Sequence, residues 1–451
     1  MRRAGQLTSL LLVAFLGGLF YLAYVLVSES PYYMAKSGTV SYGTVYDREG
    51  DVLFDGVHAL TAYPAGQFAD LGNLIGDTSG QMSNTLISAN LGELANYSFL
   101  FGSDLGQVAL KTTLLHRANK AVWQALGKKD GAVIAYNWKT GELLTCVSKP
   151  NIDIAKGYSD LGKLPAGSLL NKAFYPTVPG STQKVSTLIA AYQHMGIDAV
   201  NELEYSCSGS WLNANRQLIK CHKSAGHGKQ TLYDAFANSC NPWFAQLIQS
   251  GKLPLSSVIE SYTKMGYAVN GADAPALDMD GIRIPAASTT LTDANDFDTQ
   301  WGCLGQGMTL VSPFQLMLWE GAVANGTGIA VKPYLIAEKT AVDGTKTPRS
   351  GTESTGQMFT AEAAKAVRDV MTDNAKKHYS VSLGKYVCGV KSGTAQVTQD
   401  GKSYENSFLT GFCLDDRCPV AFCVMIENRV KTDISAAQVT KVLLDALCGV
   451  Q

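Results

Sequence analysis

The stretch Pro179-Gly180-Ser181-Thr182-Gln183-Lys184 stands ahead of a long apolar pattern, Val185 to Tyr192. The Pro-Gly pair marks a turn, and apolar residues at this spacing predict a buried helix that Ser181 opens. Residues three apart share a helix face, so Ser181 and Lys184 are expected to lie side by side. A serine hydroxyl becomes a nucleophile when a base takes its proton, and a lysine with a lowered pKa can be that base. The pair also fits a plain amphipathic helix with a serine cap.

Two further stretches supply partners for this pair. Ser239-Cys240-Asn241 follows a helical pattern at residues 232–237, and Lys391-Ser392-Gly393-Thr394 lies inside a predicted strand, residues 387–397. Each is ordinary alone, one as a turn at a helix end and the other as an edge strand whose lysine blocks aggregation. The ordered set S-x-x-K, S-x-N and K-[ST]-G is the motif set of penicillin-binding proteins and serine β-lactamases. The chain therefore resembles that family.

The resemblance is to the class B, monofunctional penicillin-binding proteins and extends over most of the chain. Residues 43–50, Gly-Thr-Val-Tyr-Asp-Arg-Glu-Gly, look like the opening signature of that class, and residues 131–150 are similar to its first transpeptidase hairpin. Tyr42 departs from the usual arginine before that signature, which we expect to affect domain packing. The likeness is weakest from Tyr63 to Leu105. Further similar positions are Gly305-Gln306-Gly307 and Asn325-Gly326.

The resemblance implies a catalytic role for five residues. Ser181 would attack the carbonyl of a penultimate D-alanine, and Lys184 would accept the serine proton. Ser239 would relay a proton to the leaving amine as general acid. Asn241 would hydrogen-bond the substrate amide and help to seat Lys184. Lys391 would be a second cation that keeps Lys184 partly neutral and attracts the terminal carboxylate of the substrate.

The strand around Lys391 is expected to bind the substrate. Ser392 and Thr394 would hydrogen-bond the terminal carboxylate. Gly393 has no side chain, so a substrate strand is expected to lie against this edge. The backbone N–H groups of Ser181 and Thr394 would form an oxyanion hole, which typically contributes a few kcal/mol to catalysis.

Composition restricts the classes of partner. The chain has 451 residues, is 46% hydrophobic and carries a net charge of -1 without charge runs. This length allows two domains with a large core. The charge balance argues against nucleic acid as a partner.

The N-terminus predicts a membrane anchor. The run from Leu7 to Val27 has no charge and is long enough to span a bilayer. Arg2 and Arg3 place the N-terminus in the cytoplasm and the remaining chain outside the cell membrane. A cleaved signal peptide is the competing interpretation, but the run is long for one and no clear small-x-small site follows Val27.

The predicted fold class is α+β. Residues 1–29 would form a cytoplasmic tip and transmembrane helix, residues 30–115 a small pedestal module, and residues 116–451 a transpeptidase domain with an antiparallel sheet flanked by helices. Helical patterns dominate from Ser181 to about residue 320, apart from a loop-rich section at residues 270–301. Strands then return near the C-terminus, before a last helix at residues 435–447.

Cys207, Cys221, His227 and Cys240 are a plausible tetrahedral zinc set. Some elongation-type class B penicillin-binding proteins carry a zinc near the active site, and the Cys221–His227–Cys240 spacing resembles theirs, although the ligand types partly differ. A zinc with four protein ligands would be structural, and the chemistry itself requires no cofactor. A Cys207–Cys221 disulfide is an alternative, since an exported location permits one. A third alternative is a small buried Cys240 beside an ordinary surface histidine.

The expected function is peptidoglycan D,D-transpeptidation through an acyl-enzyme on Ser181, inhibited by β-lactams. The expected substrates are stem peptides ending in D-Ala-D-Ala, and the expected partner is a separate membrane glycan polymerase, because residues 30–115 are too few for a glycosyltransferase. A D,D-carboxypeptidase, a β-lactamase or membrane-bound β-lactam sensor, and a catalytically silent cell-wall scaffold are the alternatives.

Overall fold

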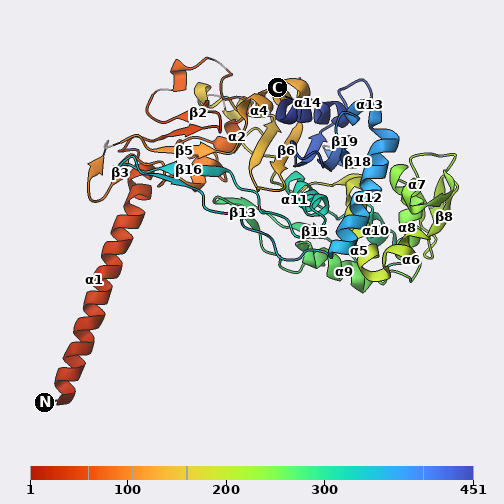
Figure 1. Cartoon of the computed structure of the whole chain (residues 1–451), viewed down its shortest axis with the longest axis horizontal. Coiled ribbons are helices and arrows are strands. Elements are labelled where there is room, and N and C mark those ends of the chain that lie inside the picture. Colours follow the sequence, from red (N-terminus) through yellow and green to blue (C-terminus); the bar gives the residue numbers. More distant parts are fainter. Residues whose placement is uncertain are drawn as a thin grey trace.

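The computed structural model describes residues 2–449 except residues 59, 65, 104–105, 159–160 and 400. Its first element, helix α1 (Arg2–Lys36), projects away from the folded part of the chain (Figure 1). Between Gly5 and Lys36 this helix is long and apolar enough to cross a membrane, and no residue of its most apolar window is buried. The predicted apolar span therefore lies wholly within one exposed helix.

The first sheet contains both early and late strands of the chain. Its five strands have the order β17 (Lys346–Pro348), β16 (Ile336–Thr340), β5 (Ala109–Thr112), β1 (Thr44–Tyr46) and β2 (Val52–Asp55). The strand, turn and strand predicted at residues 43–53 are confirmed as β1 and β2. The carboxylate of Asp47 closes their turn by accepting hydrogen bonds from the N–H groups of Glu49 and Asp51, both at 2.8 Å.

Residues 56–108 connect β2 to β5 through short elements. Because β2 is antiparallel to β1 and β5 is parallel to β1, this connection leaves β2 and enters β5 at the same end of the sheet. Its described elements are η1 (Leu60–Ala62), α2 (Gly72–Ile75), α3 (Leu86–Ala89), β3 (Tyr97–Ser98) and β4 (Gly102–Ser103). Strands β3 and β4 pair as a small antiparallel hairpin.

Strands β16 and β17 add a feature that the sequence pattern did not reveal. Both belong to residues 116–451, yet β16 pairs with β5 in the first sheet. Two short strands without a strong alternating pattern gave no signal for this long-range pairing. The division into residues 30–115 and 116–451 stays a prediction.

The second sheet is antiparallel and forms the centre of the molecule. Its order is β18 (Cys388–Gln399), β19 (Lys402–Cys413), β20 (Val420–Ile426), β6 (Gly131–Asn137) and β7 (Leu143–Lys149). All five strands were predicted, with β19 starting earlier than the apolar pattern indicated. A disulfide joins Cys418, just before β20, to Cys448 at the end of the last helix.

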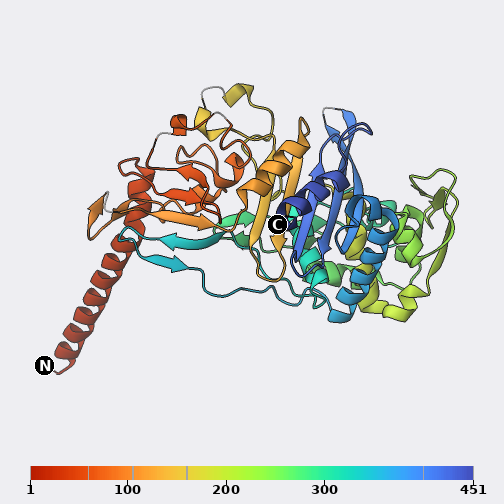
Figure 2. The same ribbon diagram turned by 45° about the horizontal axis from the view of Figure 1, so that its top comes forward.

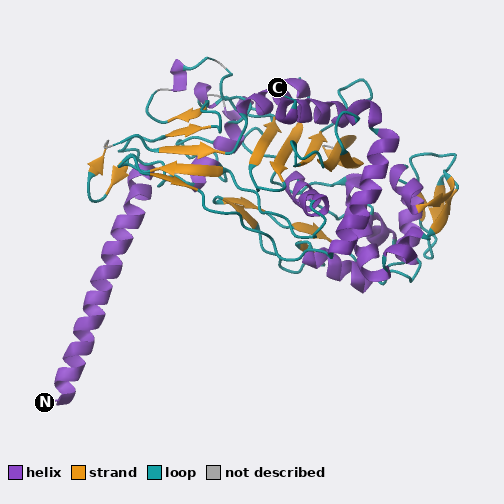
Figure 3. Ribbon diagram, viewed as in Figure 1, coloured by secondary structure: helices purple, strands orange, loops and turns teal. Residues whose placement is uncertain are grey.

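Alternating residues of β20 divide the core into two layers. Val420, Phe422 and Val424 face α4 (His116–Leu126) and α14 (Ala436–Cys448). Ala421 and Cys423 face α11 (Pro313–Ala324) and the large helical layer behind it. The sheet is thus covered by helices on both faces, and Figure 3 shows these layers beside the smaller N-terminal sheet. The predicted α+β class is confirmed.

The helical layer carries the site and includes small strand pairs that were not predicted. Residues 204–231 were expected to be helical, but they form two antiparallel strand pairs, with the β9–β10 hairpin between the paired strands β8 and β11. The sequence did not show this because such short polar strands carry no clear periodicity. The other described elements between β7 and β18, apart from α11, β16 and β17, are η2 (Ile154–Lys156), η3 (Leu161–Lys163), η4 (Gly180–Gln183), α5 (Lys184–Met195), α6 (Ile197–Asn201), β8 (Glu204–Cys207), β9 (Ser210–Leu212), β10 (Leu218–Lys220), β11 (Gly228–Thr231), α7 (Leu232–Ala237), α8 (Asn241–Gln249), α9 (Leu255–Lys264), β12 (Tyr267–Val269), β13 (Leu277–Met279), β14 (Ile282–Ile284), β15 (Ala287–Thr289), α10 (Phe297–Cys303), α12 (Ala361–His378) and α13 (Ser380–Leu383).

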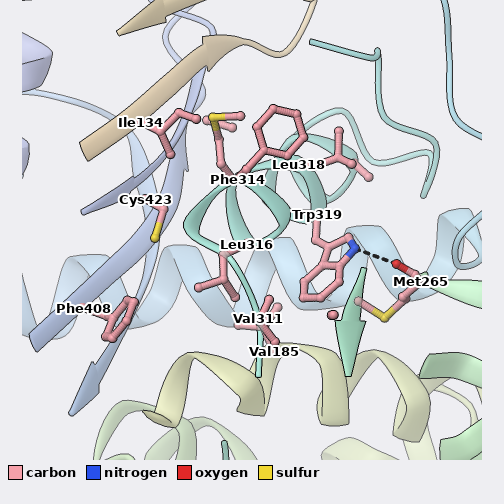
Figure 4. Close-up of a cluster of buried hydrophobic side chains, with 14 of the residues drawn as sticks. Ile134, Val185, Met265, Val311, Phe314, Leu316, Leu318, Trp319, Phe408 and Cys423 are labelled. Carbon is pink, nitrogen blue, oxygen red and sulfur yellow. Dashed lines mark hydrogen bonds between the residues drawn. The ribbon is translucent and has the colours of Figure 1, made fainter. Parts of the chain in front are cut away.

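Helix α11 joins the sheet to this layer. All of its residues are buried, which fits a helix that is apolar on every side. Figure 4 shows Phe314, Leu316 and Trp319 of α11 between the sheet and α5. The indole N–H of Trp319 donates to the carbonyl of Met265 at 3.0 Å, so this buried ring leaves no polar atom unpaired. Residues of α5, α11 and the second sheet thus belong to one continuous hydrophobic core.

Candidate active site

Ser181 lies on a 3-10 turn, η4, that leads directly into α5. The prediction that Ser181 opens the α-helix is wrong, because α5 begins at Lys184. The turn is fixed by a hydrogen bond from the N–H of Gly180 to the carbonyl of Gly305, at 2.8 Å. Gly180 has a φ of 58°, which L residues with side chains rarely adopt. The predicted adjacency is confirmed, since the Nζ of Lys184 lies 2.7 Å from the Oγ of Ser181.

Lys184 is fully buried and is held by two further residues. Its Nζ donates to the Oδ1 of Asn241 at 2.7 Å and to the carbonyl of Ser239 at 3.0 Å. The Oγ of Ser239 lies 3.3 Å away. The amide of Asn241 donates in turn to the carbonyl of Lys220 at 3.1 Å, which fixes its orientation. The predicted role of Asn241 in seating Lys184 therefore has a geometric basis.

Ser239 lies between the two lysines. The Nζ of Lys391 donates to the Oγ of Ser239 at 3.0 Å and to the carbonyl of Ser392 at 2.8 Å. Ser239 follows α7 with a φ of 51°, an uncommon value for a residue with a side chain. Such backbone strain costs on the order of 1–3 kcal/mol and is typical of functional sites. Here it turns the carbonyl and the hydroxyl of Ser239 toward Lys184.

Burial, more than charge, lowers the pKa of Lys184. Removal from water lowers the pKa of this ammonium to about 7, so a large fraction is neutral near neutral pH. Burial also lowers the pKa of Lys391 well below its ordinary value, and repulsion from the Lys184 ammonium lowers it further. We expected Lys391 to be a main cause of the shift at Lys184. Instead, burial is the main cause, since the protein interior that surrounds both lysines disfavours the charged form of each.

Strand β18 presents a free edge to Ser181. It is an edge strand and pairs only with β19 in the second sheet. The N–H of Leu414 donates to the carbonyl of Val387, so these two residues form a hydrogen-bonded pair of the ladder. Hydrogen-bonded and non-hydrogen-bonded pairs alternate along antiparallel strands, which makes the even-numbered residues of β18 non-hydrogen-bonded. The peptide groups of Ser392 and Thr394 therefore face away from β19. The side-chain amide of Gln306 donates to the carbonyl of Thr394 at 3.1 Å, on this outward side. The predicted oxyanion donor of Thr394 therefore points away from the sheet.

Gly393 serves a different purpose from the predicted one. A Cβ at this position would lie 2.8 Å from the carbonyl oxygen of Pro179 and 3.0 Å from a methyl carbon of Thr182. The space beside Gly393 is therefore filled by the turn that carries Ser181, and not left for a substrate strand. The absence of a side chain lets β18 and η4 approach each other closely, which sets the distance from Ser181 to Lys391.

The motif residues line one cleft of about 940 Å³. Ser181, Ser239, Asn241, Ser392 and Thr394 all reach it, while Lys184 and Lys391 lie buried beneath. Several lining residues were not predicted, because they come from separate elements and form no local motif. These are Leu218, His222, Phe297, Trp301, Leu304, His378 and Glu405.

Cys207, Cys221, His227 and Cys240 come together behind the cleft. Their ligand atoms all lie within 4.8 Å of one another. Cys207 ends β8, Cys221 and His227 lie at the two ends of the loop between β10 and β11, and Cys240 directly precedes α8. A tetrahedral zinc with Zn–S bonds of about 2.3 Å needs sulfur–sulfur separations of roughly 3.8 Å, so the set fits zinc after a small contraction. Cys207 and Cys221 are free thiols here, so the alternative disulfide is not formed.

The arrangement has the parts of a serine acyl-transfer centre. A nucleophile contacts a base of lowered pKa, a second hydroxyl can pass on the proton, and a buried cation and a free strand edge lie beside them. Because β18 has unpaired peptide groups, an extended peptide-like ligand can add to it as a further strand.

Comparison with known proteins agrees with this class. The model of the penicillin-binding protein transpeptidase domain matches residues 131–445, and the chain belongs to this family. It is 29% identical over 294 residues to stage V sporulation protein D of Bacillus subtilis, a match that covers 63% of this chain and 42% of that protein. It is also 29% identical over 260 residues to the peptidoglycan D,D-transpeptidase PbpA of Mycobacterium tuberculosis, covering 53% of this chain and 50% of that protein. The chain thus spans about half the length of these relatives.

A solved structure has the same fold. The penicillin G acyl-enzyme complex of penicillin-binding protein A from Mycobacterium tuberculosis superposes with a TM-score of 0.75 at 21% sequence identity. The superposition covers 90% of this chain and 99% of that chain. The likeness therefore includes the first sheet as well as the second.

Proposed function

We propose that the chain is a D,D-transpeptidase that cross-links peptidoglycan stem peptides through an acyl-enzyme on Ser181. The observation that carries this proposal is the contact of Ser181 with Lys184, whose pKa of about 7 makes it a base at neutral pH. The family membership and the names of the relatives support the same activity.

The proposed reaction begins when Ser181 attacks the carbonyl of the penultimate D-alanine. Lys184 takes the serine proton, and Ser239 passes a proton to the nitrogen of the departing D-alanine. Lys391 and the hydroxyls of Ser392 and Thr394 bind the terminal carboxylate. An acceptor amine then attacks the acyl-enzyme and releases Ser181 with the new peptide bond formed.

The proposed location is a bacterial cell membrane. The exposed apolar helix α1 supports a single span, and the paired arginines at residues 2 and 3 support a cytoplasmic N-terminus. The folded part would then face the cell wall, where stem peptides are found. A membrane glycan polymerase is the proposed partner that supplies the strands to be cross-linked.

A structural zinc at Cys207, Cys221, His227 and Cys240 belongs to the same proposal. Four protein ligands would close the site, so zinc would hold the turn at Cys240 beside Ser239 and take no part in the chemistry. Metal analysis of the purified full chain should find one zinc per chain, and Cys207→Ser should lose it. Cys303→Ser, which changes another buried free thiol, should keep it. Absence of zinc together with a Cys207–Cys221 bridge would contradict this.

Fluorescent penicillin tests the central proposal. Wild type should be labelled covalently, and Ser181→Ala should not. Equal labelling of both proteins, or no labelling of a folded wild type, would refute the acyl-enzyme. Product analysis with a stem peptide and a D-amino acid acceptor then separates the transpeptidase, which forms the exchanged peptide, from a carboxypeptidase, which only removes D-alanine.

A further inference from the structure

The turn between β3 and β4 exposes three consecutive large apolar side chains. Phe99, Leu100 and Phe101 are 47%, 68% and 69% exposed. Loop tips are usually built from small and polar residues, so an apolar tip is a feature that requires a partner. The hairpin from Tyr97 to Ser103 carries no charged residue. Transfer of this tip out of water would therefore desolvate no charge.

This hairpin is fixed to the end of α1. Tyr97 of β3 packs against a cluster that includes Ala35 of α1 and Ala95, and the hydroxyl of Tyr42 donates to the carbonyl of Ala35 at 2.7 Å. Figures 1 and 2 both show β3 beside the point where α1 meets the folded part. The position of the hairpin along the helix axis is therefore set by the helix itself.

The helix places this hairpin near the membrane surface. A bilayer hydrocarbon core of about 30 Å takes up about 20 helical residues, which here run from Leu7 to Leu26. Ala35 then lies about 14 Å beyond the hydrocarbon, and the headgroup layer occupies roughly 5–7 Å of this distance. The hairpin turn extends about 10 Å from β3 at 3.4 Å per residue, so its tip can reach the headgroup layer.

We propose that the Phe99–Phe101 turn inserts into the boundary between headgroups and acyl chains as a second point of membrane attachment. This inference rests on the proposed membrane span of α1. The tip presents three consecutive exposed apolar side chains on a narrow turn, which suits a lipid surface better than a protein groove. Two attachment points would restrict the rotation of the folded part about α1 and hold the catalytic cleft at one orientation to the membrane.

A tryptophan reporter tests the insertion directly. All six native tryptophans lie at residue 123 or later, so Leu100→Trp places a reporter on the hairpin of the full chain. The protein is reconstituted into phosphatidylethanolamine–phosphatidylglycerol vesicles with brominated acyl chains. We expect quenching of Leu100→Trp beyond the wild-type level. Val381→Trp, at a 99% exposed position on α13 far from α1, should show no extra quenching. Added Phe99→Ser and Phe101→Ser changes should reduce the quenching.

Two outcomes would overturn this proposal. One is no extra quenching of Leu100→Trp while alkaline extraction shows that α1 still holds the chain in the vesicle. The other is quenching that appears only after a membrane polymerase is added, which would assign the turn to a protein partner. Penicillin labelling of the same variant reports separately on the active site. If neither the variant nor the wild type were labelled by penicillin, the proposed enzymatic activity would be refuted, while the quenching result would still stand.

Discussion

The Nζ of Lys184 and the Nζ of Lys391 both contact the Oγ of Ser239, at 3.3 Å and 3.0 Å. One hydroxyl thus lies between two buried amines, and Ser181 contacts only the first of them by a side-chain hydrogen bond in the described structure. This relationship supports the proposed role of Ser239 in passing a proton from Lys184 to the leaving group. It also explains why a residue with a strained φ occupies this position.

The acylation rate should depend on pH through Lys184. The pKa of this group is lowered to about 7, and only its neutral form accepts the serine proton. The rate with penicillin should therefore rise tenfold per pH unit below about 7 and level off above it. Stopped-flow acylation of wild type measures this profile. Lys184→Gln should lose about 100-fold to 10,000-fold in rate. A flat wild-type profile from pH 5 to 9 would contradict the assigned base.

Replacing Lys391 should weaken the binding of penicillin without changing the pKa of Lys184. Lys391→Met removes the cation expected to bind the substrate carboxylate, so penicillin should bind more weakly. Because burial is the main cause of the shift at Lys184, the midpoint of the pH profile should stay near 7. Acylation rates measured at saturating and subsaturating penicillin across the pH range give both the strength of penicillin binding and the midpoint of the pH profile. A midpoint that moves to the range of an ordinary lysine would show that Lys391, and not burial, controls the base.

Gly393→Ala should damage the site more than the fold. The new methyl group would meet the carbonyl of Pro179 at 2.8 Å and push the Ser181 turn away from β18. A displacement of about 1 Å at a catalytic group costs on the order of 100-fold in rate. Gly356→Ala is the matched control, since nothing lies within 4 Å of a Cβ there. Acylation rates and unfolding midpoints of both variants are compared. Unchanged acylation in Gly393→Ala would show that the close approach is not needed.

Glu320 should make stability depend on pH. Its carboxyl lies buried on α11, and burial raises its pKa to about 8, while the unfolded chain has a pKa near 4.5. The unfolded state therefore loses this proton first, and the free energy of unfolding should fall as pH rises from about 5 to 8, by on the order of 3 kcal/mol. Glu320→Gln should remove this slope, as measured by urea unfolding at pH 5, 6, 7 and 8. An equal slope in both proteins would place its cause elsewhere.

The site residues that could be predicted from the sequence are those that belong to short local motifs. Three short motifs gave the residues that converge, because the residues of each motif lie within three positions of one another: Ser181 and Lys184 at a helix start, Ser239 and Asn241 at another, and Lys391 on a strand with Gly393. The strands of the second sheet and the last helix were predictable because they are apolar runs or their apolar residues recur at helical spacing. The four candidate zinc ligands were suggested by residue type and by a spacing that resembles that of zinc-carrying family members.

The remaining features depend on packing between distant segments. Nothing near residue 336 indicates that β16 completes a sheet begun at Thr44. Trp301 and Glu405 line the same cleft as Ser181 only because the fold brings these distant segments together. The role of Gly393 was misjudged because the sequence does not show what fills the space beside it. The balance between burial and charge at Lys184 likewise depends on the environment that the whole core creates.

Mass spectrometry of the penicillin-labelled peptide tests the central claim most directly. The full chain is acylated with penicillin G and digested, and the modified residue is located by fragmentation. The account predicts one penicilloyl group per chain, on Ser181 in the peptide that contains Lys184. A penicilloyl group on Ser239 or on any other residue, or an unmodified Ser181 in a chain that binds penicillin covalently, would contradict it.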